Sequence, residues 1–318
     1  MESEVAGRLR ADLALGLLPV TEAAALACAA QLGRSDQGHV RDLAAAAMLQ
    51  GLQELGVRVR VVLGPRGDHY LSHGTSVGAD QMPVVDLGVY PVEGASLVAR
   101  GLPNAISLVV AVEPDTFPQP PAVWYVEKMV AGPEARGAID LDDPLADNLR
   151  RIAFARNARV SDLAVAVLDR PRHQDLMEEV RAAGARVMAL EEGDIAGSLM
   201  AATEGTGVDA MVGIGGLQET VIAACAVRCL GGELQARLWP RNDQERMLAG
   251  EAAGRAFGVA DLSPAAVVMA VTGISGGALL PAVSLGGGWA ETSSLVLASQ
   301  QASVRRVLSR HRRGPEPA

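Results

Sequence analysis

Two arginines and a histidine stand together in the segment Arg170-Pro171-Arg172-His173. They follow an apolar run, Ala164–Leu168, that predicts a buried strand. In open α/β sheets, ligands bind beyond the carboxyl ends of the strands, and the planar guanidinium of arginine matches phosphate oxygens. The segment therefore predicts a phosphate clamp. The alternative is an ordinary charged helix start, although cations are disfavoured there unless an anion joins them.

A second polar group, Glu192-Gly193-Asp194, follows another predicted strand, Arg186–Leu190, and opens a predicted helix. Carboxylates at a strand end can accept hydrogen bonds from the hydroxyls of a sugar. The alternative is helix capping, because the helix dipole stabilises acidic side chains at an N-terminus.

A glycine-rich segment, Gly213-Ile214-Gly215-Gly216, stands between a predicted strand and a predicted helix. A dinucleotide-binding loop would need a third glycine at position 218, which is Gln218. The segment fits better a close backbone approach to a phosphate or a sugar. Glu219, just inside the following helix, could reach the same crevice.

The segment Tyr90-Pro91-Val92-Glu93-Gly94-Ala95 follows the apolar run Val84–Val89. Pro91 cannot donate to a sheet ladder, so the strand is expected to stop there. A strand end that runs into a proline, acid and glycine turn could hold a metal and a phosphate. Such a turn normally supplies two carboxylates and a hydroxyl, and Tyr90 and Ala95 occupy two of those three places.

Other residues offer weaker metal chemistry. His69 and His73 are four residues apart, with Asp68 beside them, but Gly64-Pro65-Arg66-Gly67 predicts a loop rather than the helix that would bring them together. The cysteines Cys225 and Cys229 lie in an apolar helical run and are expected to pack in the core.

Composition limits the function classes. The chain has 318 residues, of which 49% are hydrophobic and 3% aromatic, and length alone favours about two domains. A net charge of −9 and a pI near 5.1 exclude a general binder of nucleic acids or anionic membranes. The charged N-terminus and the lack of a long apolar run predict neither a signal peptide nor a membrane span. Three cysteines without a disulfide framework favour the cytoplasm.

The hydrophobic pattern predicts an α/β protein. The expected helices are residues 8–33, split or kinked at Pro19, and residues 40–55. Strands are expected at 57–63, 84–89, 105–112, 164–168, 186–190, 208–212, 266–271, 293–297 and 303–308. Helices are expected at 173–183 and 195–202, and the tail from Arg310 is expected to be disordered.

Taken together, ordered stretches from Val20 to Arg306 resemble class II fructose-1,6-bisphosphatase. The most specific stretches are Pro103-Asn104-Ala105-Ile106-Ser107, Tyr125-Val126-Glu127-Lys128, Gly137-Ala138-Ile139-Asp140-Leu141, Leu168-Asp169-Arg170-Pro171-Arg172-His173, Gly213-Ile214-Gly215-Gly216, Arg228-Cys229-Leu230-Gly231-Gly232-Glu233 and Gly273-Ile274-Ser275-Gly276-Gly277. The resemblance implies a layered sugar-phosphatase fold (αβαβα-type) with two subdomains. Residues 1–157 would form the metal and phosphatase half, and residues 158–318 the sugar-phosphate-binding half.

The resemblance also implies a substrate site. Its positions fall on Gly94, Tyr125, Arg170, Arg172, His173, Glu192, Gly193, Asp194 and Gly215. Glu192 stands where the family usually has an aspartate, and Gln37 stands where it often has a lysine.

The metal positions that the resemblance implies are largely replaced. Glu93 and Glu219 remain, whereas other ligand positions fall on Arg41, Pro65 and Tyr90. Ala95 occupies the place of a threonine that positions the attacking water, so no catalytic residue is assigned. Each lost unit charge changes the gross Coulomb energy at the metal by roughly 4 kcal/mol, at a distance of about 4 Å and an effective dielectric constant of about 20. Asp42 is no obvious substitute for Arg41, since one helix position turns a side chain by about 100°.

Three hypotheses follow. The first is a family member that binds a phosphorylated sugar, with degraded metal-dependent hydrolysis and a regulatory role. The second is an active fructose-1,6-bisphosphate 1-phosphatase of gluconeogenesis, dependent on magnesium or manganese, where the first needs no metal. The third, a nucleotide-binding oxidoreductase, depends only on the glycine-rich segment. We expect a homo-oligomer or a mixed assembly with an active relative, and no partnership with nucleic acid or membrane.

Overall fold

The chain folds into two compact units. The structure is a computed structural model that describes residues 11–65, 69–79, 84–118 and 123–313. Unit 1 comprises Met1–Phe117 and Ala266–Ala318, and unit 2 comprises Pro118–Ala265. The sequence places a division after residue 157. The observed units divide elsewhere because strands on either side of the inserted unit 2 pair with each other.

Unit 1 contains a mixed sheet, sheet A, in the order β12-β13-β11-β4-β3-β1-β2, with β14 paired to β13. Its strands are β1 (Arg58–Leu63), β2 (Ser76–Val77), β3 (Val84–Glu93), β4 (Ile106–Val112), β11 (Val267–Gly273), β12 (Ser284–Gly286), β13 (Trp289–Ala298) and β14 (Ser303–Arg312). Strands β4 and β11 are fully buried, as a sheet centre requires. Only β1 and β3 run parallel to each other among these pairs.

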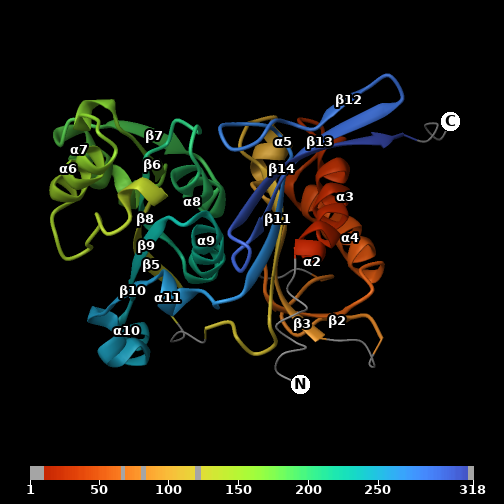
Figure 1. Cartoon of the computed structure of the whole chain (residues 1–318), viewed down its shortest axis with the longest axis horizontal. Helices are drawn as coiled ribbons and strands as arrows, with labels where there is room; N and C mark the ends of the chain where they lie inside the picture. The colour runs from red at the N-terminus through yellow and green to blue at the C-terminus, as the bar shows by residue number, and fades with distance from the viewer. Residues whose placement is uncertain (1–10, 66–68, 80–83, 119–122, 314–318) are drawn as a thin grey trace. The chain divides into compact units, whose positions relative to one another are not determined.

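The helices of unit 1 pack on sheet A, and a hydrophobic core forms between them and the strands (Figure 1). They are α2 (Ala11–Gly16), α3 (Leu18–Ala29), α4 (Gln37–Gln53) and α5 (Ala95–Arg100). Pro19 lies in the first turn of α3, where its missing N–H costs no hydrogen bond. The predicted helix over residues 8–33 is therefore two helices in its described part. Asp36 caps α4 by accepting from the backbone N–H groups of Gly38 and His39.

Strand β3 does not stop at Pro91, contrary to the prediction from sequence. It continues to Glu93, and the register with β4 shifts between Tyr90 and Glu93. Proline is tolerated at such an irregularity because the ladder hydrogen bond is already lost there. The shift brings Glu93 opposite Ile106 and leaves the turn to begin at Gly94.

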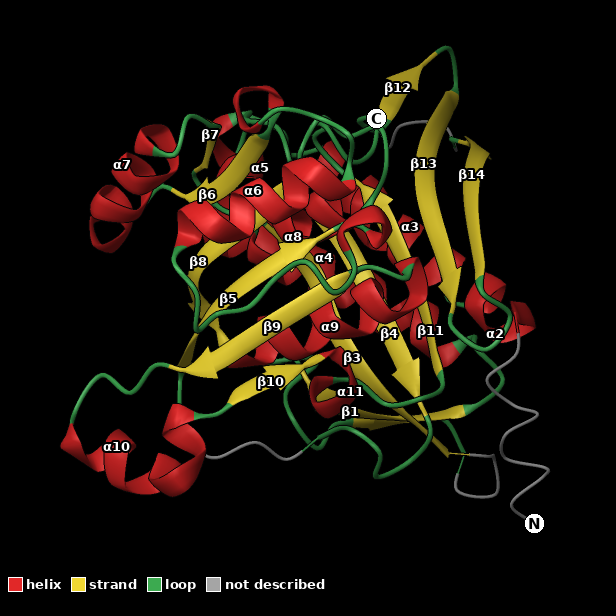
Figure 2. Ribbon diagram, turned by 60° about the vertical axis from the view of Figure 1, so that its left-hand side comes forward, coloured by secondary structure: helices red, strands yellow, loops and turns green. Residues whose placement is uncertain are grey.

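Unit 2 contains a second mixed sheet, sheet B, in the order β10-β9-β5-β8-β6-β7. Its strands are β5 (Tyr125–Ala131), β6 (Ala164–Leu168), β7 (Arg186–Leu190), β8 (Ala210–Gly216), β9 (Glu233–Leu238) and β10 (Ala256–Gly258). The strands β8, β6 and β7 are mutually parallel, whereas β5 is antiparallel to both β8 and β9. Figure 2 shows β9, β5 and β8 side by side.

Helices cover both faces of sheet B. They are α6 (Leu145–Ala155), α7 (Gln174–Ala182), α8 (Asp194–Ala202), α9 (Leu217–Leu230), α10 (Asp243–Ala249) and α11 (Val259–Leu262), with short 3₁₀ turns η1 (Pro133–Ala135), η2 (Val160–Asp162), η3 (Pro171–His173) and η4 (Gly250–Gly254). Met129 of β5 packs in a core with α6 and α7. Its neighbour Lys128 instead meets residues of α8 and α9, because alternate residues of a strand face opposite sides.

Two other expectations can be compared with the structure here. The three cysteines are buried and none is in a disulfide, and Cys225 and Cys229 lie in α9 as core residues, as predicted. The tail from Arg310 is ordered as far as Arg312, which ends β14; residues 314–318 lie outside the described part. In the described residues, no helix is long and apolar enough to cross a membrane.

Candidate functional site

Several strand ends of sheet B converge at one edge. The carboxyl ends of β6, β7 and β8 point the same way because these strands are parallel. Strand β5 is antiparallel to β8, so its first residue, Tyr125, lies beside the last residue of β8, Gly216. The carboxyl end of β9 reaches the same edge, since Leu238 pairs with Val126. The segments predicted to bind substrate therefore gather along this edge, where open α/β sheets place ligands.

Arginine and tyrosine side chains form the first part of the cluster. The guanidinium carbon of Arg172 lies 5.3 Å from the centroid of the Tyr125 ring, a cation–π distance. Arg172 also donates from Nη2 to the Ile214 carbonyl at 2.9 Å. Arg170 is held by a bond from Nη1 to the Asp169 carbonyl at 2.9 Å. Neither arginine is paired with a carboxylate in the described part of the chain, so both can meet an anion.

His173 lies beneath this cluster and not within it. The side chain is only 1% exposed. Its Nε2 accepts the Ile214 backbone N–H at 2.8 Å, so Nδ1 carries the proton and donates to the Leu168 carbonyl, also at 2.8 Å. Burial, with a smaller contribution from the charge of Arg172, lowers the pKa of His173. Of the three side chains in the predicted phosphate clamp, the histidine is neutral and packs in the interior, and the two arginines carry the charge.

Asp194 presents a buried carboxylate with one unused oxygen. The residue begins α8 and is 8% exposed. Its Oδ1 pairs with the ammonium of Lys128, which also donates to Thr220 Oγ1 at 3.2 Å. Its Oδ2 is buried and has no hydrogen-bond partner among the described residues. An unsatisfied buried acceptor costs about 1–3 kcal/mol, so a hydroxyl of a bound sugar would find a prepared acceptor.

The glycines of the segment Gly213–Gly216 each make room for a neighbouring side chain. A Cβ on Gly213 would lie 3.2 Å from the His173 ring, and one on Gly215 would lie 2.1 Å from Asp194 Oδ2. A Cβ on Gly216 would lie 1.8 Å from the Glu219 carboxylate. These residues belong to strand β8, paired with β5, and do not form a loop. The close approach predicted from sequence is thus an approach to side chains, which does not need a dinucleotide.

The remaining predicted residues of unit 2 lie at the same edge. Glu192 is half-buried between β7 and α8, and Gly193 precedes α8 with a φ of 102°, a conformation that favours glycine. Glu219 lies in the first turn of α9, directly after β8. The sheet therefore brings Tyr125, Arg172, Asp194, Gly215 and Glu219 to a common edge of one unit.

The predicted residues of unit 1 occupy the turn from β3 to α5. Glu93 ends β3 and is 8% exposed, and Gly94 follows with a φ of 89°. Ala95 is the first residue of α5 and is buried. Tyr90 is also buried in β3, so its phenol is part of the packing. The turn therefore supplies one carboxylate, that of Glu93. The first residue of α5, Ala95, supplies no hydroxyl.

The other positions of unit 1 that the resemblance implies for a metal also lack carboxylates. Arg41 is exposed on α4, with Nη2 3.4 Å from Gln37 Oε1. Pro65 is half-buried, and Asp36 is used as the cap of α4. Magnesium and manganese need several oxygen ligands, and the described residues contain no cluster of three or more acidic, histidine or cysteine side chains that could hold a metal. The residues present do not fit the divalent metals of the family.

Among the described residues, no group of three or more histidine, cysteine or acidic side chains forms at the alternative zinc site, His69 and His73. Nδ1 of His73 lies 2.8 Å from the Val62 carbonyl, and both histidines are exposed. Asp68 lies outside the described residues.

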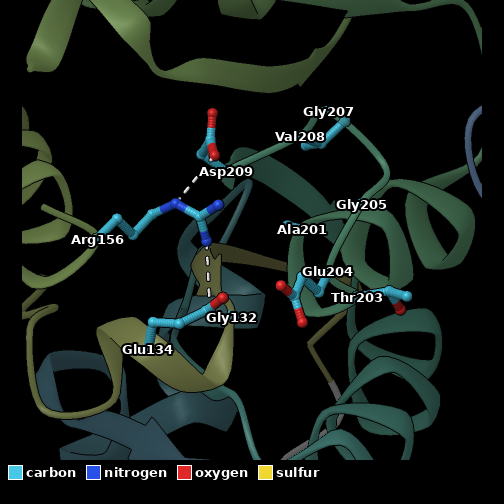
Figure 3. Close-up of a pocket in the computed structure, with 10 residues that line it drawn as sticks. All are labelled: Gly132, Glu134, Arg156, Ala201, Thr203, Glu204, Gly205, Gly207, Val208 and Asp209. Atoms are coloured by element: carbon cyan, nitrogen blue, oxygen red, sulfur yellow. Dashed lines mark ion pairs between the residues drawn. The ribbon is translucent and has the colours of Figure 1, made fainter. Parts of the chain in front are cut away.

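A cavity of about 330 Å³ lies at the opposite edge of sheet B, beyond the carboxyl end of β5 (Figure 3). Arg156 lies between two carboxylates there, with Nε 3.0 Å from Asp209 Oδ1 and Nη1 3.4 Å from Glu134 Oε2. Glu204 adds a third carboxylate to the lining. The negative balance disfavours a phosphate ester, so we do not place the sugar-phosphate site in this cavity.

Three further residues lie with the predicted substrate residues at the same edge of sheet B and were missed from the sequence: Lys128, Trp239 and Arg241. Lys128 stands in one of the stretches that carry the resemblance, but a lysine within a strand gives no sign that it is buried. Trp239 follows β9, and its ring meets that of Tyr125 edge-on, with centroids 6.5 Å apart and planes at 82°. Arg241 lies over both Trp124 and Tyr125. A tryptophan directly after an alternating strand was the available signal.

Two mixed sheets flanked by helices fit the layered α/β fold of the sugar phosphatases. The comparisons agree with this class. Residues 11–311 match the family model of bacterial fructose-1,6-bisphosphatase, glpX-encoded. The chain belongs to this family.

Two curated relatives extend the match to nearly the whole chain. A protein of Haemophilus influenzae named fructose-1,6-bisphosphatase class 2 is 37% identical, over 94% of this chain and 96% of the relative. A protein of Escherichia coli K12 named fructose-1,6-bisphosphatase 1 class 2 is 34% identical, over 97% of this chain and 98% of the relative.

Proposed function

We propose that this protein binds a phosphorylated sugar of the fructose 1,6-bisphosphate class at the edge of sheet B. The single observation that supports this most is Asp194 Oδ2, a buried acceptor without a donor in the described residues. This oxygen lies beside Gly215. The preceding residue, Ile214, accepts a hydrogen bond from Arg172 through its backbone carbonyl. Arg170 and Arg172 supply positive charge for a phosphate, and Asp194 supplies an acceptor for a hydroxyl.

Hydrolysis of the bound ester is the activity that the names of the relatives carry. Similarity over nearly the full length of the chain favours the same activity here. In such a reaction Arg170 and Arg172 would orient the phosphate, and Asp194 would orient the sugar. The family uses magnesium or manganese, which would supply an activated water and stabilise the leaving oxygen. Because the described ligand positions do not fit these metals, we derive no catalytic step through them.

Binding without hydrolysis is the second candidate function. It is favoured by one observation, the replacement of family ligand positions by Arg41, Pro65 and Tyr90, together with Ala95 in place of a threonine. Such a protein could regulate or accompany an active relative, either as a homo-oligomer or in a mixed assembly.

Calorimetry and a phosphate-release assay test both candidates. We expect fructose 1,6-bisphosphate to bind, and Arg172→Ala to weaken binding about 10- to 100-fold, the value of a charged hydrogen bond or two. Arg150→Ala removes an exposed arginine of the same unit and is the matched control. Absence of binding by the wild-type protein contradicts the proposal.

The release assay, with manganese and with magnesium, separates the two candidates. Turnover that Glu93→Gln abolishes would establish the phosphatase and contradict the binding-only function. Binding without any phosphate release would do the reverse.

A further inference from the structure

Two arginines contact the same tyrosine ring in unit 2. The guanidinium carbon of Arg172, from η3, lies 5.3 Å from the centroid of Tyr125. That of Arg241, from the segment between β9 and α10, lies 5.5 Å from the same centroid and 5.2 Å from the centroid of Trp124. The substrate positions that the resemblance implies include Tyr125 and Arg172 but not Arg241.

The two arginines differ in their charge partners. Arg241 donates from Nε to Glu245 Oε1 at 2.9 Å, and its Nη2 meets the same oxygen. Its backbone N–H donates to the other oxygen, Oε2, at 2.9 Å. Glu245 is 5% exposed, and Asn242 caps its backbone N–H. Hydrogen bonds from Arg241 lower the pKa of Glu245, which therefore stays ionised and neutralises the arginine. Among the described residues, the one hydrogen-bond partner of Arg172 is the backbone carbonyl of Ile214.

We propose that Arg241 is a positioning residue, which with Glu245 holds the ring of Tyr125 in place, and that Arg172 alone of the two meets the phosphate. This inference rests on the proposed sugar-phosphate site and adds to it a supporting wall formed by Trp124, Trp239, Arg241 and Glu245. A neutralised guanidinium has little charge to offer an anion. Its planar face still fits an aromatic ring, which a lysine ammonium does not.

Glu245→Gln tests the role of Arg241, because the two possible roles predict opposite changes in ligand affinity. If Arg241 bound the phosphate, removing the neutralising carboxylate would tighten the binding of fructose 1,6-bisphosphate. If Arg241 positions Tyr125, the same change loosens its anchor and should weaken binding about 3- to 10-fold. Asp243→Asn is the matched control, because it removes one negative charge from an exposed pair on the same helix. It should leave the dissociation constant within about twofold. Tighter or unchanged binding in Glu245→Gln overturns the proposal.

A second measurement needs no ligand. The chain has three tryptophans, and Trp289→Phe leaves Trp124 and Trp239 as the emitters. In that background Arg241→Lys should raise the quenching of tryptophan emission by acrylamide, because the lysine cannot cover Trp124 or hold Tyr125 against Trp239. Arg246→Lys, on the following helix α10, should leave quenching unchanged. Equal quenching in the two variants contradicts the positioning role.

The two arms separate the failure of this inference from the failure of the proposed function. If the wild-type protein binds no fructose 1,6-bisphosphate but Arg241→Lys raises quenching, the positioning role stands and the ligand is wrong. If the wild-type protein binds and neither Glu245→Gln nor Arg241→Lys changes binding or quenching, the ligand stands and the positioning role is wrong.

Discussion

At the scale of single residues, His173 makes stability depend on pH. Its pKa lies below the ordinary value of 6.5, so the unfolded chain takes up a proton before the folded chain does. The contribution of His173 is fully present above about pH 6.5 and is lost as the pH falls towards the folded pKa. We expect the free energy of unfolding to fall below pH 6.5 by at most about 1.4 kcal/mol per pH unit from this group.

Urea unfolding at pH 7.5 and at pH 5.5 measures this effect. In His173→Gln the pH slope should be smaller, although the variant is less stable at both pH values because Leu168 and Ile214 lose a partner. An unchanged slope in His173→Gln would show that His173 takes up its proton equally well in the folded and the unfolded protein, which contradicts a lowered pKa.

At the scale of elements, the end of β8 is fitted to the start of α8. Gly215→Ala places a Cβ where Asp194 Oδ2 now lies, and the carboxylate cannot move without disturbing Lys128. We expect a loss of stability of about 1–3 kcal/mol, the usual cost of overpacking. Denaturant unfolding measures it. Gly254→Ala is the control, because no atom lies within 4 Å of its added Cβ.

A compensating change sharpens this test. Asp194→Ala in the Gly215→Ala background removes the clash, so the second substitution should cost less there than in the wild-type protein. A cost that is the same in both backgrounds would mean that the two residues do not interact.

The elements that sequence predicted best are those with a strong local pattern. The runs Ala164–Leu168 and Arg186–Leu190 were confirmed as β6 and β7, because apolar residues bounded by turns define short strands. Strand β3 was predicted too short, since the effect of Pro91 depends on a register shift with β4. The partners of His173 lie 5 and 41 residues away, and no local pattern reveals such contacts. The neutrality of the imidazole could therefore not be predicted.

At the scale of the whole molecule, the metal ligands that the resemblance implies can be introduced together. The changes Arg41→Asp, Pro65→Glu, Tyr90→Asp and Ala95→Thr would return the oxygen ligands that the resemblance implies. We expect the melting temperature of this variant to rise more with manganese than that of the wild-type protein. The expected scale is about 2–4 °C for each kcal/mol of binding. Tyr90→Asp also places a carboxylate at a buried position, so the variant should be less stable without metal.

Differential scanning calorimetry with and without manganese measures this outcome. Adding Glu93→Gln to the restored variant should remove the gain. If the restored variant responds to manganese no more than the wild-type protein does, the family positions have been assigned to the wrong residues.

The pairing of β4 with β11 sets an order for folding during synthesis. These neighbouring strands of sheet A are separated in the chain by all of unit 2. Sheet B is complete once residue 258 has left the ribosome, whereas sheet A must wait for β14, which ends at Arg312. Domains usually fold as units, the first to emerge folding first. Here the inserted unit should reach its native state on the nascent chain, while the unit that holds the N-terminus closes last.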